Sequence, residues 1–236
     1  MFGSSVSRWT IHHFAIALGF FLLAQVAMVA GFTFPIADLL APTTIAVVHL
    51  VTLGWLTILM LGALHQFVPV IMAGSQAADR SALTSLAAIV IGLIFMEVGF
   101  AALDGRLAPA AVASLPIGGA IVLAGATVGA VALGRVLWRT RPLPFSAQFI
   151  AAGLFFLLVT VLLGIIFGLA FSAPAFVPWS AVFTEGLHLH LLAGLIGWFT
   201  LTAIGVSYRL LSMFTLAPEE RGALGAAVAV LSVGGL

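Results

Sequence analysis

Hydrophobic residues fill long continuous stretches of the chain, and short polar or Pro/Gly-bearing segments separate them. A helix needs about 20 apolar residues to cross the roughly 30 Å hydrocarbon core of a membrane. Six stretches reach that length, and a seventh, Gly222–Leu236, stops earlier and is expected to be incomplete. The six are Ile11–Phe34, Thr43–Ile71, Leu83–Leu103, Ala110–Val136, Phe145–Phe171 and Ser180–Leu210. The pattern predicts an all-α, polytopic transmembrane bundle of about seven helices that forms a single domain over residues 1–236.

Composition supports a membrane protein and excludes several other classes. Hydrophobic residues make up 63% of the chain and charged residues only 6%, whereas about 25% of an ordinary soluble domain is charged. The net charge of +1 argues against a nucleic-acid partner. Cysteine is absent, which excludes disulfides, iron–sulfur clusters and covalently attached c-type heme. The expected partners are the lipid bilayer and, within it, a redox partner, other membrane subunits or a second copy of the chain.

The arginines predict an orientation. In a seven-span topology all of them except Arg106 fall on one side of the membrane, namely Arg8, Arg80, Arg135, Arg139, Arg141, Arg209 and Arg221. Positively charged loops face the cytoplasm, so the N-terminus is expected there, in a bacterial inner (plasma) membrane. The first stretch lacks a small-residue cleavage site and contains two histidines, which favours a permanent helix over a signal peptide.

A short pattern occurs twice, and histidines precede both copies. Gly-Trp-Leu-Thr starts at Gly54 and Gly-Trp-Phe-Thr starts at Gly197, with a further glycine eight residues later in each. Duplication and shared packing through small residues both explain such an echo. The topology places His49, His188 and His190 at a similar depth near the outer face. Ionisable side chains within a membrane are costly and therefore candidates for function.

The histidine positions suit a heme. At about 100° per residue, His188 and His190 point to opposite faces of one helix. Gly194 and Gly197 lie on the face of His190, where they would leave a flat slot for a planar macrocycle. His49 from another helix can supply the opposite axial ligand. Two neutral imidazoles on facing helices can hold a b-type heme in a bundle.

One segment resembles the His-x-His helix of heme-copper oxidase subunit I. It runs from His188-Leu189-His190 through Gly197-Trp198 and Gly205 to Met213-Phe214. The segment from His49 through Gly62 and Pro69 to Gly74 is similar to an earlier helix of that family. The resemblance is closest to short orphan relatives of the C-type oxidase subunit. It implies that His49 and His190 are axial ligands of a low-spin heme b, and that His188 is a ligand of a second, high-spin heme.

The chain also departs from that family. It has about seven helices rather than about twelve, no histidine triad for copper, and a single tyrosine, Tyr208, near the inner surface. Copper-dependent reduction of oxygen or nitric oxide is therefore unsupported. Without a copper partner, His188 can instead bond to Glu185 one turn away. The expected activity is electron transfer through a bis-histidine heme near the outer face.

The remaining polar groups leave a second function open. The outer set of Glu97, Glu185 and His188 would suit a non-redox transporter, a metal-handling protein or an assembly subunit, although Glu97 alone can be a hydrogen-bonding partner within the bundle. At the inner side, His12, His13 and His65 would form either a metal or quinone site or a set of interfacial anchors.

Overall fold

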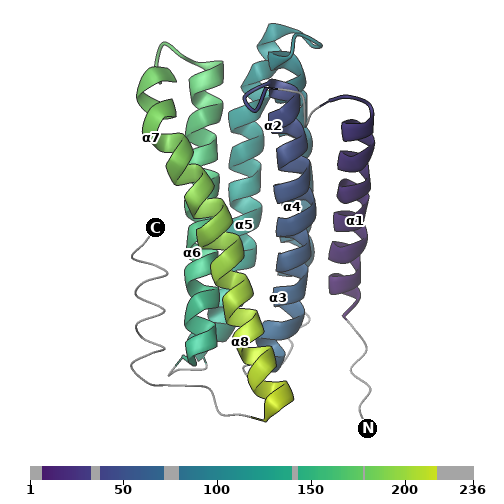
Figure 1. The fold of residues 1–236 in the computed structure, drawn as a ribbon, viewed down its shortest axis with the longest axis vertical. Helices are drawn as coiled ribbons and strands as arrows, with labels where there is room; N and C mark the ends of the chain where they lie inside the picture. Colours follow the sequence, from purple (N-terminus) through teal and green to yellow (C-terminus); the bar gives the residue numbers. More distant parts are fainter. Residues whose placement is uncertain (1–6, 33–37, 72–79, 140–142, 178, 217–236) are drawn as a thin grey trace.

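The computed structural model describes residues 7–32, 38–71, 80–139, 143–177 and 179–216, and all regular structure within them is helical (Figure 1). The elements in chain order are α1 (Arg8–Val29), α2 (Pro42–His49), η1 (Leu50–Thr57), α3 (Ile58–Ile71), α4 (Ser81–Leu103), η2 (Pro109–Ala113), α5 (Ser114–Arg139), α6 (Phe145–Ser172), α7 (Trp179–Leu191), η3 (Leu192–Thr200) and α8 (Leu201–Thr215). The segments η1 and η3 are π-helical, and η2 is a short 3₁₀ helix.

Two sets of three elements form continuous helices. We call α2–η1–α3 the His49 rod and α7–η3–α8 the His190 rod. Each rod counts as one span, and six helices of the described chain are long and apolar enough to cross a membrane. These six correspond to the first six predicted stretches. The seventh, Gly222–Leu236, lies outside the described residues.

The helix ends follow local sequence signals. The Ser7 side chain accepts a hydrogen bond from the Trp9 backbone nitrogen at the start of α1. Pro42 occupies the first position of α2, where no backbone donor is needed. Gly105 follows α4 with a φ of 76°, a conformation that glycine adopts without strain.

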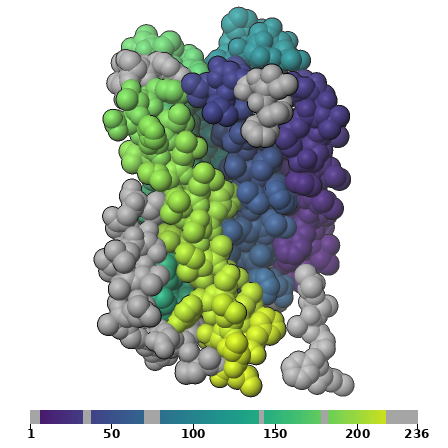
Figure 2. Space-filling model, viewed as in Figure 1, coloured from purple at the N-terminus to yellow at the C-terminus, as the bar shows by residue number. Residues whose placement is uncertain are grey.

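Neighbouring helices pack through small residues. The pairs in closest contact are α4 with α5, α5 with α6, α1 with the His49 rod and α6 with the His190 rod. A Cβ atom on Gly92 of α4 would lie 2.6 Å from the Gly118 carbonyl oxygen of α5, so these backbones nearly touch. Such close approach is typical of helices packed in a membrane. Figure 2 shows the two rods side by side on one face of the molecule.

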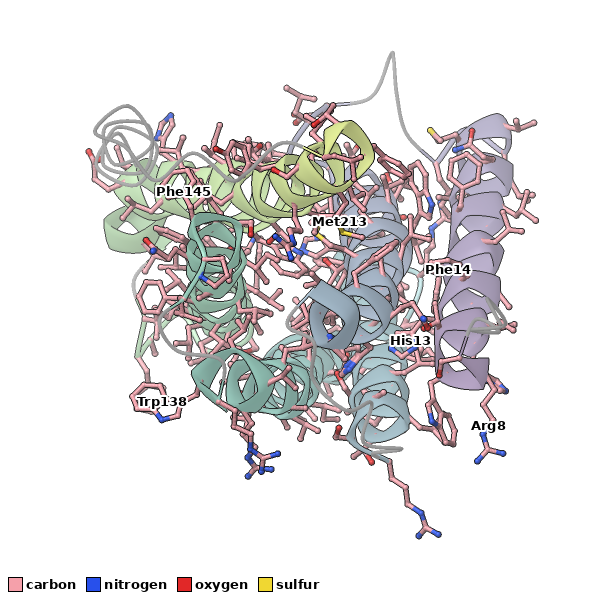
Figure 3. The ribbon with its side chains drawn as sticks, turned by 90° about the horizontal axis from the view of Figure 1, so that it is seen from below. Arg8, His13, Phe14, Trp138, Phe145 and Met213 are labelled. Atoms are coloured by element: carbon pink, nitrogen blue, oxygen red, sulfur yellow. The ribbon has the colours of Figure 1, made fainter. Side chains whose placement is uncertain are left out.

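The described arginines gather at one end of the bundle. In Figure 1 the upper end is where α1 ends and α2 begins, and the lower end is where α1 begins and α8 ends. Arg106 lies at the upper end, after α4. The lower end carries Arg8, Arg80, Arg135, Arg139 and Arg209, and Figure 3 shows that end from below. The asymmetry that the sequence predicts is therefore present among the described residues.

Candidate functional site: a histidine pair between two rods

The imidazole rings of His49 and His190 meet in the upper half of the bundle, although 140 residues separate them in the chain. Their ring centroids are 6.5 Å apart and their planes differ by 31°. Both side chains are half-buried. His49 is the last residue of α2 and His190 is the last but one of α7, so each ring lies directly before a π-helical segment.

Each ring is fixed by a hydrogen bond from its Nδ1 atom. The Nδ1 atom of His49 lies 2.8 Å from the Ile45 carbonyl oxygen, and that of His190 lies 3.0 Å from the Thr160 carbonyl oxygen of α6. A carbonyl oxygen can only accept, so both Nδ1 atoms donate. Each neutral ring then carries its lone pair on Nε2, the tautomer in which a metal-binding histidine is commonly held.

Aromatic side chains from two further helices pack on the pair. Phe100 of α4 lies against His49 with ring centroids 5.2 Å apart, and Phe167 of α6 makes an edge contact with His190 at 5.6 Å. A Cβ atom on Gly164 would lie 3.3 Å from Cε1 of His190, so α6 also supports that ring from behind. The ring contacts of the pair with α4 and α6 are therefore with apolar groups.

The repeated Gly-Trp-x-Thr pattern corresponds to a repeated structure. Thr57 donates its hydroxyl to the Thr52 carbonyl at 2.8 Å, and Thr200 donates to the Leu195 carbonyl at the same distance. Both acceptors are five residues earlier, the spacing that backbone hydrogen bonds also have in a π-helix. The two rods thus have π segments at equivalent positions. Such segments are often found at functional sites.

The repeat extends to the helix that precedes each rod. A Cβ atom on Gly54 would lie 2.8 Å from Phe20 of α1, and one on the equivalent Gly197 would lie 2.5 Å from Phe156 of α6. The unit of α1 with the His49 rod therefore resembles the unit of α6 with the His190 rod. This arrangement favours duplication of a helix pair as the origin of the sequence echo.

One buried hydrogen bond connects the two rods below the histidines. The indole Nε1 of Trp198 donates to the Thr57 hydroxyl at 3.1 Å, and both side chains are at most 3% exposed. Trp198 and Thr57 belong to the two copies of the repeated pattern, so the repeat also supplies the contact between its copies.

The predicted glycine slot is filled by α6. Gly194 and Gly197 lie on the same side of the rod as His190, as expected, and this side packs on Thr160 and Phe156. A Cβ atom would lie 3.3 Å from Thr160 at the first position and would clash with Phe156 at the second. In this structure both glycines permit close approach of two helices.

His188 lies apart from the pair. Its side chain is exposed, and its Nδ1 atom donates to the Thr184 carbonyl at 3.1 Å. Glu185 is also exposed, whereas one carboxyl oxygen of Glu97 is buried without a hydrogen-bond partner among the described residues. No group of three or more His, Asp or Glu side chains within the described ranges is arranged to hold a metal ion.

The separation of the two rings can be compared with that of two imidazoles bound to one metal ion. Two imidazoles bound on opposite sides of a metal at about 2.0–2.1 Å would have ring centroids roughly 6.3 Å apart, close to the 6.5 Å found here. The sequence pattern indicated this pair but not the Thr160 carbonyl, the two phenylalanines or the Trp198–Thr57 bond. The repeated Trp and Thr were the signal for that bond.

Comparison with known proteins gives no further information about the site. No family model, no curated protein and no solved structure matches the chain.

Proposed function

We propose that the protein is a heme-binding integral membrane protein, in which His49 and His190 are the axial ligands of a b-type heme that carries electrons. The observation that carries this proposal is the pair of imidazoles from two different rods, with centroids 6.5 Å apart and both Nδ1 atoms bonded to backbone carbonyls. That arrangement leaves two Nε2 lone pairs in one apolar location. Two neutral imidazoles this close together within a membrane bundle are suited to binding one ligand between them.

Each residue of the site has a defined task in this proposal. The Ile45 and Thr160 carbonyls hold the rings in orientation and increase the basicity of Nε2. Phe100 and Phe167 cover part of each ring. When bound, a heme supplies reversible one-electron chemistry, and the protein controls its potential through the ligands and the burial.

The location of the site supports a transfer role near one membrane face. The pair lies in the upper half of the bundle, away from the arginine-bearing lower end (Figure 1). Under the positive-inside rule the lower end faces the cytoplasm. We therefore assign the heme to the outer half of a bacterial inner membrane, where an electron donor or acceptor can approach it. His188, being exposed and directed elsewhere, is assigned no heme in this proposal.

The test is heme content and spectrum in matched variants. Full-length protein from heme-supplied cells is expected to contain one heme per chain with a low-spin, redox-active spectrum. His49→Ala and His190→Ala should each lose the low-spin spectrum, while His188→Ala, which removes an exposed histidine two residues from His190, should keep it. Heme-free protein from heme-supplied cells, or an unchanged low-spin spectrum in both pair variants, would refute the proposal.

The same preparation distinguishes the non-redox alternative. Metal analysis of the purified protein should find iron in proportion to heme. The alternative predicts zinc or copper in place of heme, and loss of that metal in His49→Ala and His190→Ala. That result would indicate a metal-handling protein.

A further inference from the structure

A second pair of histidines lies at the lower end of the bundle. His13 of α1 and His65 of α3 have ring centroids 5.9 Å apart and planes that differ by 48°. Figure 3 shows His13 on the side of α1 that faces the other helices. His65 follows His49 by sixteen positions along one continuous rod, half of them π-helical, which corresponds to a separation on the order of 20 Å along the axis. The two pairs are therefore separate sites.

His13 is oriented to present a lone pair inside the protein. Its side chain is 1% exposed, and its Nδ1 atom donates to the Trp9 carbonyl at 2.8 Å. Its Nε2 atom is buried and has no hydrogen-bond partner within the described part of the chain. Leaving such a group unsatisfied costs about 1–3 kcal/mol, so a ligand at this atom would be favoured.

The packing around His13 limits the size of that ligand. A Cβ atom on Gly62 of α3 would clash with Cβ of His13, so the two helix backbones are in close contact at this level. A planar macrocycle needs facing helices that stand apart, and this spacing leaves no room for one between α1 and α3. A single metal ion between the rings needs far less space.

The donors and charges select the kind of ion. Imidazole nitrogens suit zinc, copper, iron and nickel. The acids in the described residues, Asp38, Glu97, Asp104 and Glu185, are all in the upper half or at the upper end. None of these described acids lies at the lower end, and the cost of burying an ion without a carboxylate partner rises with the charge of the ion. An ion of single charge that binds only two ligands is therefore favoured. Monovalent copper carries a single charge and can bind two imidazoles.

The ring spacing agrees with such a centre. Two imidazoles bound in line at about 2.0 Å per bond would have centroids roughly 6.3 Å apart. The 5.9 Å found for His13 and His65 corresponds to a slightly bent arrangement. Neighbouring hydrogen bonds hold the two helices in register: Gln66 Oε1 accepts from the Ser7 backbone nitrogen at 3.0 Å, and the Thr10 hydroxyl donates to the Gly62 carbonyl at 3.3 Å.

From these observations we propose that His13 and His65 form a site for one monovalent copper ion at the lower end of the bundle. The site is independent of the heme proposed above, because the two use different residues at opposite ends of the His49 rod.

The test is a competition titration of purified full-length protein with Cu(I) under reducing conditions, using a chromophoric Cu(I) chelator. One ion per chain is expected. Removing even a supporting group typically weakens metal binding about 10–100-fold, so His13→Asn and His65→Asn should each weaken it at least about 100-fold. His12→Asn is the matched control, since His12 is adjacent but exposed and bonded to the Arg8 carbonyl. Its affinity should equal that of the wild type.

Two results of the titration would overturn the proposal: wild-type affinity in His13→Asn and His65→Asn, or an equal loss in His12→Asn. X-ray absorption of the copper-loaded wild type does not depend on any variant folding. It should show two nitrogen ligands, and a shell of three or four ligands would contradict the site. His49→Ala and His190→Ala should retain copper while losing heme, so the two proposals can fail separately.

Discussion

The hydrogen bond between Trp198 and Thr57 provides a quantitative test of how the two rods are joined. Thr57→Val keeps the shape of the side chain but removes the hydroxyl that accepts from Trp198 at 3.1 Å and donates to the Thr52 carbonyl at 2.8 Å. The indole N–H, in a side chain only 1% exposed, would then lack its acceptor.

The size of the effect can be estimated from the two bonds lost. An unsatisfied buried donor costs about 1–3 kcal/mol in soluble proteins, whereas side-chain hydrogen bonds between membrane helices average about 0.6 kcal/mol and reach about 1.7. We therefore expect Thr57→Val to lower the free energy of unfolding by about 1–2 kcal/mol. Thr200→Val is the matched control because Thr200 makes the equivalent bond to Leu195 but is exposed. Its loss should stay below about 0.5 kcal/mol.

The assay is equilibrium unfolding of the purified, heme-free protein in mixed micelles with increasing denaturing detergent. A double-mutant cycle with Trp198→Phe isolates the pair from the rest of the substitution. Equal losses in Thr57→Val and Thr200→Val, or a coupling energy near zero in the cycle, would refute the reasoning that this bond connects the rods.

Two further predictions concern helix packing, and both are measured by the same unfolding assay. Gly197→Ala places a Cβ atom 2.5 Å from Phe156 and should lower the free energy of unfolding by about 1–3 kcal/mol. Gly134→Ala has open space within 4 Å and should raise the free energy of unfolding by up to about 1 kcal/mol. A change of the same sign in both variants would contradict the packing. Ser85→Ala removes a buried 2.8 Å hydrogen bond to the Gly125 carbonyl and should lower the free energy of unfolding by about 0.6 kcal/mol. Thr84→Ala removes an exposed hydrogen bond to the Arg80 carbonyl and should cost less. The reverse order would be inconsistent with a role for Ser85 between α4 and α5.

Span positions were predictable because length and apolarity alone determine them. The stretch Leu83–Leu103 corresponds to α4 at Ser81–Leu103, and Ala110–Val136 corresponds to η2 and α5 together. Pro and Gly at the breaks explain the agreement, since they end helices for local reasons. The approximate depth of His49 and His190 followed from the same spans, and the structure brings their rings together.

The rotation of each helix about its axis was not predictable in the same way. The first helix is apolar on nearly all sides, since Ile11, Leu18 and Leu22 are more than half exposed while Ala17 and Ala24 are fully buried. Apolar residues suit both the lipid-facing side and the protein-facing side of a membrane helix, so the hydrophobic pattern of the sequence does not identify the buried face. The contact of His13 with α3 therefore needed the structure. So did the filling of the expected slot at Gly194 and Gly197 by residues of α6.

The π segments also escaped prediction, because a π-helix differs from an α-helix only in which carbonyl each N–H reaches. The repeated threonines were a usable signal, since Thr57 and Thr200 both donate to a carbonyl five residues earlier. A hydroxyl at that position can satisfy a carbonyl that the wider turn leaves short of a partner.

The histidine pair lies between two similar units, each made of one rod and the helix that precedes it. Each rod packs on its own partner helix, the His49 rod on α1 and the His190 rod on α6, and the His49 rod also contacts α4. The pair lies between the units and takes one ring from each. A ligand present at 100 times its dissociation constant adds about 2.7 kcal/mol to stability, more than the 1–2 kcal/mol expected for the Trp198–Thr57 bond. A ligand that binds wild type and Thr57→Val equally adds the same increment to both, so the Thr57→Val loss should be the same in heme-loaded and heme-free protein, and a smaller loss in the loaded protein would contradict equal binding.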